Sequence, residues 1–219
     1  APPASAGPAP RDEAAARTAP AAEPGTLERE RPAVDRCVAV IPAFNEAQTV
    51  GDLIRRVRAQ LPDVIVVDDG SGDATAAEAR RLDVRLVRHP ANAGKGRSLI
   101  DGLQAARADG FDAAVTLDAD GQHRARDIPR LLQFAGAGTL VLGSRVNDAG
   151  RMPRARRIAN RIAGLFISWA AGQRIGDTQC GLRVYPTGAV AALGLTGRRR
   201  GFVFESEVLI EAARQGWRI

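Results

Sequence analysis

Short runs of apolar residues alternate along the chain with segments in which apolar residues recur every three or four positions. The runs predict buried strands, and the spaced segments predict amphipathic helices. The expected strands cover residues 37–41, 64–67, 84–87, 113–117, 139–143 and 182–185. The expected helices cover residues 47–60, 73–82, 96–109, 127–135, 157–172 and 205–215. Residues 144–156, between the fifth strand and the fifth helix, are polar and Arg-rich, which predicts a mobile loop.

This order of elements indicates an α/β fold. Strands that are apolar along their whole length and alternate with helices favour a mostly parallel sheet with helices on both faces. Right-handed crossovers make such a sheet doubly wound and Rossmann-like. The chain stops at Trp217–Ile219, where another strand would begin, so we expect the C-terminal strand to be truncated.

The first 35 residues differ from the rest of the chain. They are rich in Ala and Pro and poor in large apolar side chains, so they cannot bury enough surface to offset the entropy of ordering. We therefore expect a disordered segment at residues 1–35 and one folded domain at residues 36–219.

Composition limits the classes of function and the compartment. The net charge is +6, and 30 of the 31 basic residues are Arg, which fits either solubility or attraction to phosphates. An aromatic content of 4% argues against a nucleic-acid partner, because single strands bind by stacking. Two cysteines, and the absence of a signal peptide or a membrane-length apolar run, predict a cytoplasmic protein whose membrane contact would be peripheral.

Polar side chains follow each of the first five expected strands, at Pro42–Glu46, Asp68–Ser71, His89–Lys95, Asp118–Asp120 and Gly143–Arg145. One such group could be a helix cap, but five on one edge of a sheet are hard to explain as caps. Ligands of doubly wound sheets bind beyond the carboxyl ends of the strands. We therefore expect the functional site at this edge.

The segment after the fourth strand has the composition of a metal site. Asp118 and Asp120 supply two carboxylates, and Gln122 adds a neutral oxygen. Such hard ligands suit Mg²⁺ or Mn²⁺, with a diphosphate and water completing the shell. The alternative is an Asx-rich turn that caps the next helix. An aspartyl-phosphate phosphatase is disfavoured, because its acidic pair follows the first strand.

Two other strand ends carry candidate ligand contacts. Asp68 and Asp69 could accept hydrogen bonds from a ribose or a base, or could form a turn before a helix. Lys95, the single lysine of the chain, lies between two glycines near a helix N-terminus, a setting that favours a phosphate contact over a solvated loop charge.

Together these residues resemble the family 2 glycosyltransferases with the GT-A fold. The segments that carry the resemblance are Val40–Glu46, Val66–Ser71, Asn92–Gly96, Leu117–His123 and Gly143–Arg145. Asp177–Tyr185 is similar to the acceptor segment of the polyprenol-phosphate and dolichol-phosphate sugar synthases, and Phe202–Glu207 to a later acidic motif. The chain departs from those synthases in lacking a basic residue shortly after Arg183 and the C-terminal membrane helices of many relatives.

The resemblance implies a role for each motif. Base and ribose would contact Pro42, Phe44, Asn45, Glu46 and either Asp68 or Asp69. The diphosphate and sugar would lie near Lys95, Asp118 and Ala119, with the metal on Asp118, Asp120 and Gln122. The phosphates of donor and acceptor would meet Arg145 and Arg183.

The resulting hypothesis is an inverting, metal-dependent transfer of a sugar from a GDP- or UDP-sugar to a polyprenyl phosphate at the cytoplasmic membrane face. An anionic phosphate needs no strong base, whereas a hydroxyl of a cell-envelope glycan would need Asp177 or Glu205 to take its proton. Two other hypotheses remain. One is a non-catalytic nucleotide-sugar binding protein. The other is a nucleotidyltransferase, which is disfavoured because this chain lacks the glycine-rich loop that such enzymes usually have after the first strand.

The helix at 157–172 carries a wide apolar side formed by Ile158, Ile162, Leu165, Phe166 and Trp169. Because amphipathic helices usually pack inward, we expect this side in the core. The alternative is a helix that docks on lipid, with the arginines before it facing anionic headgroups.

Overall fold

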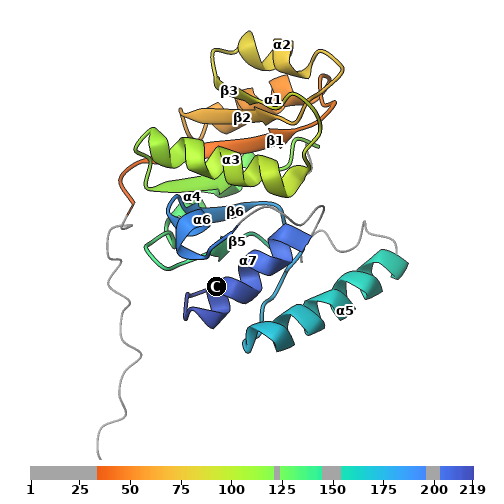
Figure 1. Ribbon diagram of the computed structural model, residues 1–219, viewed down its shortest axis with the longest axis vertical. Coiled ribbons are helices and arrows are strands. Elements are labelled where there is room, and N and C mark those ends of the chain that lie inside the picture. The colour runs from red at the N-terminus through yellow and green to blue at the C-terminus, as the bar shows by residue number, and fades with distance from the viewer. Residues whose placement is uncertain (1–33, 121–123, 145–153, 196–202) are drawn as a thin grey trace, which may run out of the picture. The chain divides into compact units, whose positions relative to one another are not determined.

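The computed structural model describes residues 34–120, 124–144, 154–195 and 203–219 (Figure 1). All of them belong to one unit, Arg31–Ile219. Residues 1–33 of the predicted disordered segment at 1–35, and residues 145–153 of the predicted loop at 144–156, lie outside the described residues, so both stay predictions there. Residues 154–156 of that loop are helical instead.

Six strands form a single mixed sheet in the order β3-β2-β1-β4-β6-β5. The strands are β1 (Cys37–Ala43), β2 (Val64–Asp68), β3 (Arg85–Arg88), β4 (Ala113–Thr116), β5 (Val141–Leu142) and β6 (Arg183–Pro186). The first four are parallel, and β6 runs antiparallel to both β4 and β5. The predicted α/β fold with a mostly parallel sheet is confirmed.

The antiparallel direction of β6 decides which residues reach the carboxyl edge of the sheet. Arg183, the first residue of β6, pairs with Thr116, the last residue of β4. The loop before β6 therefore arrives at the same edge as the loops after β1, β2 and β4. A hydrophobic pattern does not encode strand direction, so the pattern alone does not predict this neighbourhood.

Helices surround the sheet at the expected places. They are α1 (Val50–Arg58), α2 (Thr75–Arg80), α3 (Lys95–Ala108), α4 (Ile128–Leu132), α5 (Arg154–Ala171), α6 (Ala189–Ala192) and α7 (Val203–Arg214). A short 3-10 helix, η1 (Ala125–Asp127), leads into α4. Among the described helices, η1 and α6 were not predicted, because helical segments of three or four residues are too short to show a period.

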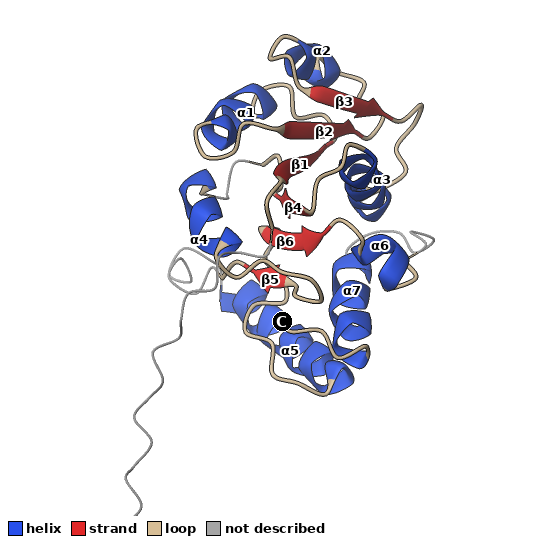
Figure 2. Ribbon diagram, turned by 90° about the vertical axis from the view of Figure 1, so that its left-hand side faces the viewer, coloured by secondary structure: helices blue, strands red, loops and turns tan. Residues whose placement is uncertain are grey.

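Two apolar layers cover the two faces of the sheet (Figure 2). Val38 and Val40 of β1 pack in a cluster with residues of α3, α6 and α7. Ala39 and Ile41 face the other way, into a cluster with residues of α1 and α4. This alternation along one strand is what a sheet buried on both faces requires.

The helix α5 corrects one expectation. It packs beside α7 (Figure 1), but the apolar side expected in the core is exposed. The exposed fractions are Ile158 59%, Ile162 50%, Leu165 67%, Phe166 68% and Trp169 83%. Ile167 and Ala171 supply the buried contact instead. Within the described residues, no helix combines the length and apolar composition needed to cross a bilayer.

The last residues lie beside the segment that precedes β5. Arg218 forms a parallel bridge with Thr139. Its amide donates to the carbonyl of Gly138 at 3.0 Å, and its carbonyl accepts from the amide of Leu140 at 2.8 Å. This is a single bridge outside the named strands, so the predicted C-terminal strand stays a prediction.

The close approach of α3 to the sheet generates a stability prediction. A Cβ on Gly102 would lie 2.4 Å from Val40 Cγ1 and 3.1 Å from Val67 Cγ2. Gly102→Ala should therefore lower the free energy of unfolding by about 1–3 kcal/mol, although alanine favours a helix intrinsically by about 1 kcal/mol. Urea unfolding measures the change.

Gly164→Ala is the matched control. A Cβ at this helical glycine of α5 would lie 3.7 Å from Thr178 Oγ1, an ordinary contact. The control should be as stable as the wild type or more stable. Equal stability of the wild type and the Gly102→Ala variant would show that α3 does not depend on this close packing.

Candidate functional site

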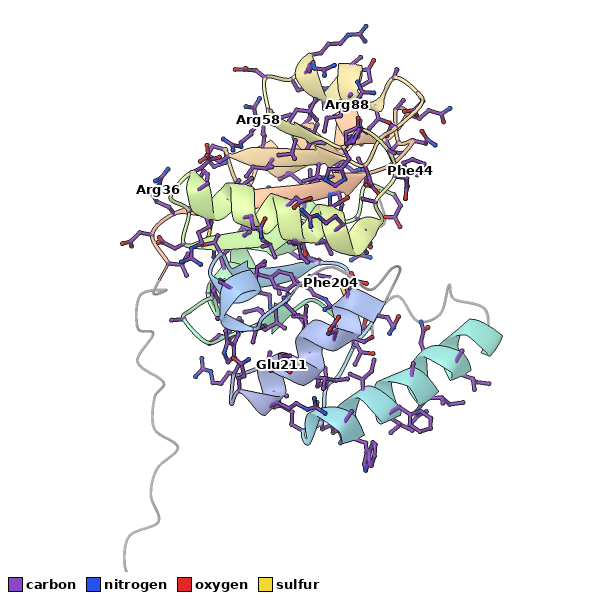
Figure 3. The ribbon with its side chains drawn as sticks, in the orientation of Figure 1. Arg36, Phe44, Arg58, Arg88, Phe204 and Glu211 are labelled. Carbon is purple, nitrogen blue, oxygen red and sulfur yellow. The ribbon has the colours of Figure 1, made fainter. Side chains whose placement is uncertain are left out.

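A pocket of about 430 Å³ lies at the carboxyl ends of β1, β2 and β4. Phe44 lies at this end of the sheet and Arg36 at the opposite end (Figure 3). The pocket is lined by Pro42, Ala43, Phe44, Glu46, Asp69, Asn92, Gly94, Lys95, Ser98, Asp118, Ala119, Asp120, Asn160, Gln179 and Glu205. Most of the residues predicted for substrate or metal binding are therefore brought together, from positions far apart in the sequence.

The two aspartates after β4 face the pocket. Asp118 is partly exposed there, and its Oδ1 lies 2.6 Å from the ammonium nitrogen of Lys95. Gly181 makes room for this carboxylate, because a Cβ at that position would lie 2.3 Å from Asp118 Oδ2. Asp120 is more exposed and lines the same pocket. Asp118 thus already pairs with the ammonium of Lys95, and the carboxylate of Asp120 lies close by in the chain.

Lys95 connects the aspartates after β4 to α7. Its ammonium nitrogen also lies 3.0 Å from Glu205 Oε1. Burial lowers the pKa of Lys95, but the carboxylates of Glu205 and Asp118 outweigh burial and raise the pKa above its ordinary value. Lys95 therefore carries its positive charge throughout the physiological range.

The donor set of the pocket fits a hard divalent cation that is shared with a ligand. Within the described part of the chain, no three His, Cys, Asp or Glu side chains form a metal site by themselves. Mg²⁺ and Mn²⁺ are, however, commonly held by one or two carboxylates together with the phosphates of a substrate. Asp118 and Asp120 supply such a pair. The third predicted ligand, Gln122, lies outside the described residues.

The loop after β1 forms the wall nearest β2. Pro42, Phe44 and Glu46 line the pocket, and Phe44 is 44% exposed, so an aromatic face is available for stacking. Asn45 does not line it. Asn45 adopts φ 56°, its side-chain oxygen accepts from the Gly72 amide at 3.0 Å, and its backbone amide donates to the Ser71 hydroxyl at 2.9 Å. It therefore ties the two loops together rather than contacting a ligand.

The structure separates the neighbouring aspartates after β2. Asp69 lines the pocket, and its carboxylate accepts from the amides of Ala93 and Gly94 at 2.9 and 2.8 Å. Asp68 is fully buried outside the pocket. Its Oδ1 accepts from the Ser71 amide, and its Oδ2 forms an ion pair with Arg88 that lacks hydrogen-bond geometry. Of the two, Asp69 is the one that lines the pocket, and Asp68 braces the turn.

Arg183 corrects the expectation of a phosphate contact. The side chain is fully buried and donates to the carbonyls of Cys180, Thr178 and Glu205 at 2.8, 2.9 and 3.0 Å. Burial lowers its pKa, but Tyr185 and Glu205 raise the pKa more, so the guanidinium stays charged. Arg183 therefore holds the loop before β6 and the start of α7 in place, and it is not among the residues that line the pocket.

The two candidate bases have different surroundings. Glu205 is buried, lines the pocket and pairs with Lys95. Asp177 is not among the lining residues, and its carboxylate accepts from the amide of Gln179 at 3.0 Å, as in an Asx turn. Arg145, the other predicted phosphate contact, lies outside the described residues.

Four polar lining residues were not predicted from the sequence: Asn92, Ser98, Asn160 and Gln179. Asn92 and Gln179 belong to segments already singled out, so the motifs could have suggested them. Ser98 lies one turn into α3, where its hydroxyl meets the carbonyl of Gly94 at 3.4 Å. Asn160 comes from α5, and nothing in the sequence pattern places α5 beside the strand ends.

Comparison with known proteins agrees with this geometry. The sequence model of glycosyl transferase family 2 matches residues 38–202. An undecaprenyl-phosphate mannosyltransferase of Micrococcus luteus is 31% identical over 195 residues, which cover 84% of this chain and 80% of the relative. A UDP-N-acetylglucosamine–dolichyl-phosphate N-acetylglucosaminyltransferase of Methanococcus voltae is 30% identical, with 80% and 79% covered.

A solved structure shares the fold. It is glucosyl-3-phosphoglycerate synthase from Mycobacterium tuberculosis in complex with Mn²⁺, uridine diphosphate and phosphoglyceric acid. The TM-score is 0.64 at 21% identity, and the match covers 83% of this chain. This chain spans 65% of the length of that protein, just under two thirds. The likeness confirms the predicted GT-A fold.

The reassignment of Arg183 makes a prediction. Arg183→Lys should lower the free energy of unfolding by about 3 kcal/mol, because several buried carbonyls would lose their donors. Thermal and urea unfolding measure the loss. Arg107→Lys, at an exposed position of α3, is the control and should be neutral. A stable Arg183→Lys protein whose only defect is a higher KM for the acceptor would support the original hypothesis that Arg183 contacts a phosphate.

Proposed function

Because the chain belongs to glycosyl transferase family 2, we propose that it transfers a sugar from a nucleotide-sugar to a polyprenyl phosphate with the help of Mg²⁺ or Mn²⁺. The pocket at the carboxyl edge would hold the donor. The relatives named for undecaprenyl phosphate and dolichyl phosphate support a lipid phosphate as acceptor. The Mn²⁺ and uridine diphosphate of the solved relative support the metal and the type of donor.

The charge of the pocket carries this proposal. Among the described lining residues, Glu46, Asp69, Asp118, Asp120 and Glu205 are acidic, and Lys95 is basic. Such a surface repels a diphosphate unless additional positive charge binds with it. A divalent cation between the aspartates after β4 and the diphosphate would reverse that repulsion. The donor would therefore bind together with its metal.

The donor would extend from the β1 loop towards β4. Phe44 would stack on the base, and Glu46 and Asp69 would accept hydrogen bonds from the base or ribose. Lys95 would contact the diphosphate at the N-terminus of α3, where backbone amides and the helix dipole also favour an anion. When bound, the metal would act as a Lewis acid for the leaving diphosphate.

The acceptor would approach from the side of α5 and α7. Asn160, Gln179 and Glu205 line this side of the pocket. A phosphate acceptor is already anionic and attacks the anomeric carbon without losing a proton, so attack opposite the leaving diphosphate would invert that carbon. If a glycan hydroxyl is the acceptor, Glu205 lies in the pocket to take its proton, which favours it over Asp177.

The outward face of α5 would bring the enzyme to its lipid acceptor. The same helix carries Asn160 in the pocket and five large exposed apolar side chains on its outer side. An apolar helix face with basic residues such as the exposed Arg161 binds the boundary between headgroups and acyl chains. The membrane-bound helix would thus present the pocket to a phosphate at the bilayer surface.

The metal role is tested by Asp120→Asn. The variant should lose about a hundredfold or more in transfer of labelled sugar from UDP- or GDP-sugars to undecaprenyl phosphate with Mn²⁺, because a ligand of the cation is removed. Asp127→Asn changes an exposed carboxylate outside the pocket and should keep full activity. A folded Asp120→Asn enzyme with normal turnover would refute the metal assignment.

The membrane role is tested by replacing Leu165 and Trp169 with Glu. Removing two apolar anchors should reduce co-sedimentation with anionic phospholipid vesicles about tenfold or more, because each buried side chain contributes about 1.5–3 kcal/mol. Phe134→Glu removes another exposed aromatic, 58% exposed and outside α5, as the control. Binding that is equally strong in both variants would exclude α5 as the docking face.

A further inference from the structure

The ammonium of Lys95 lies between two carboxylates that belong to different elements. Its nitrogen is 2.6 Å from Oδ1 of Asp118, which follows β4, and 3.0 Å from Oε1 of Glu205, which belongs to α7. Among the described residues that line the pocket, Lys95 is the basic side chain beside five acidic ones. The protein therefore supplies a cation of its own at a carboxylate that we assign to the metal.

Both carboxylates are held by packed backbone. The start of α7 packs on the start of α3, since a Cβ on Gly96 would lie 2.7 Å from Cβ of Phe204, the residue before Glu205. Asp118 lies against Gly181, where a Cβ would come within 2.3 Å of Oδ2. Neither acid can therefore move far from the ammonium without disturbing this packing.

The ammonium of Lys95 is the part of this cluster that can change partners. Lysine carries its charge on a flexible stem of four carbons. The side chain of Lys95 lines the pocket and is 29% exposed, whereas that of Glu205 is 8% exposed. Lys95 is also the first residue of α3, where backbone amides favour an anion. A diphosphate bound at these amides would offer the ammonium a second partner close to its own backbone.

A divalent cation and the ammonium have opposing needs at Asp118. If a metal bound Oδ1 while Lys95 stayed in place, two positive charges would face each other across one oxygen atom and repel. If the ammonium withdrew with no anion to receive it, a charge-assisted hydrogen bond would be lost. A diphosphate offsets this loss, because one of the three N–H groups of the ammonium can then donate to a phosphate oxygen.

We propose that Lys95 competes with the divalent cation for Asp118, so that the metal binds weakly until the nucleotide draws the ammonium away. The inference rests on the proposed function, in which the pocket takes both the metal and a nucleoside diphosphate. Lys95 thus opposes the metal when the metal is alone and assists it when the nucleotide is present. By linkage, metal and nucleotide raise each other's affinity by the same factor.

Lys95→Met tests the competition with Mn²⁺ alone. The variant keeps a side chain of similar length and removes its charge. The Kd for Mn²⁺ without nucleotide, measured from the signal of free Mn²⁺ in electron paramagnetic resonance, should fall about tenfold, because a charge-assisted hydrogen bond no longer has to be broken. Lys95→Arg keeps a cation and should bind Mn²⁺ as weakly as the wild type.

Arg97→Met is the control for net charge. Arg97 lies two residues further along α3 and pairs with Asp101, which is not a lining residue of the pocket. This variant loses the same charge and should keep the wild-type Kd for Mn²⁺. An equal gain in Arg97→Met and Lys95→Met would reveal a general effect of charge and overturn the inference. The absence of any gain in Lys95→Met would overturn it too.

Two double variants locate the bound Mn²⁺. If the cation uses Asp118 and Asp120, adding Asp120→Asn to Lys95→Met should abolish the gain in affinity. Adding Glu205→Gln to Lys95→Met should leave the gain intact. The opposite result would mean that Mn²⁺ merely takes the place of the ammonium between Asp118 and Glu205, and it would contradict the inference. Lys95→Gln, which can still donate hydrogen bonds to both carboxylates, repeats the measurement if Lys95→Met does not fold.

Calorimetry with UDP and GDP tests the effect of the nucleotide. The factor by which Mn²⁺ raises nucleotide affinity should be about tenfold larger in the wild type than in Lys95→Met. Equal factors in the two proteins would overturn the inference. A different result separates the proposed function from it. If Lys95→Met gains affinity for Mn²⁺ but neither nucleotide binds the wild type with Mn²⁺, the competition for Asp118 stands and the proposed function is refuted.

Discussion

Carboxylates crowd one edge of the sheet, and the need to balance their charge organises the rest of the site. Asp118 and Glu205 share the ammonium of Lys95, while Asp69 is held by His89 and two backbone amides. Glu46 accepts from the hydroxyl of Thr49 at 2.6 Å. Because these partners come from different elements, pairing the charges also fixes how α3, α7 and the strand-end loops meet.

The antiparallel strand β6 completes this arrangement from the other side. It brings Arg183 to the end of β4, where the buried guanidinium binds carbonyls of the preceding loop and of α7. The same loop supplies Gly181, which leaves space for the carboxylate of Asp118. Arg183, which does not line the pocket, thus holds both the loop beside Asp118 and the start of α7, which carries Glu205.

The sequence predicted the strands, the main helices and the edge where the site lies, because these follow from hydrophobic period and from the rule for parallel sheets. It also identified the motifs of the family. It did not distinguish Asp68 from Asp69, because the two are neighbours at the end of β2 and their burial depends on Arg88 and on the loop before α3.

Other features depend on tertiary packing. The positive charge of Arg183 suggested a phosphate contact. The side chain is in fact buried, at the start of a strand whose antiparallel direction the sequence pattern does not show. The apolar side of α5 has the spacing of a core helix, yet α5 meets α7 through Ile167 and Ala171 and leaves the wider apolar side exposed. Helical period alone does not say which apolar side faces the core.

The most direct test of the central claim is the thermal stability of the wild-type protein with UDP, GDP and dTDP, each with and without Mn²⁺. A ligand at a hundredfold excess over its Kd adds about 2.7 kcal/mol to the free energy of unfolding. If the acidic pocket takes a nucleoside diphosphate together with its metal, at least one nucleotide should stabilise the protein strongly with Mn²⁺ and weakly without it. Stabilisation that does not depend on Mn²⁺, or the absence of stabilisation with every nucleotide, would contradict the account.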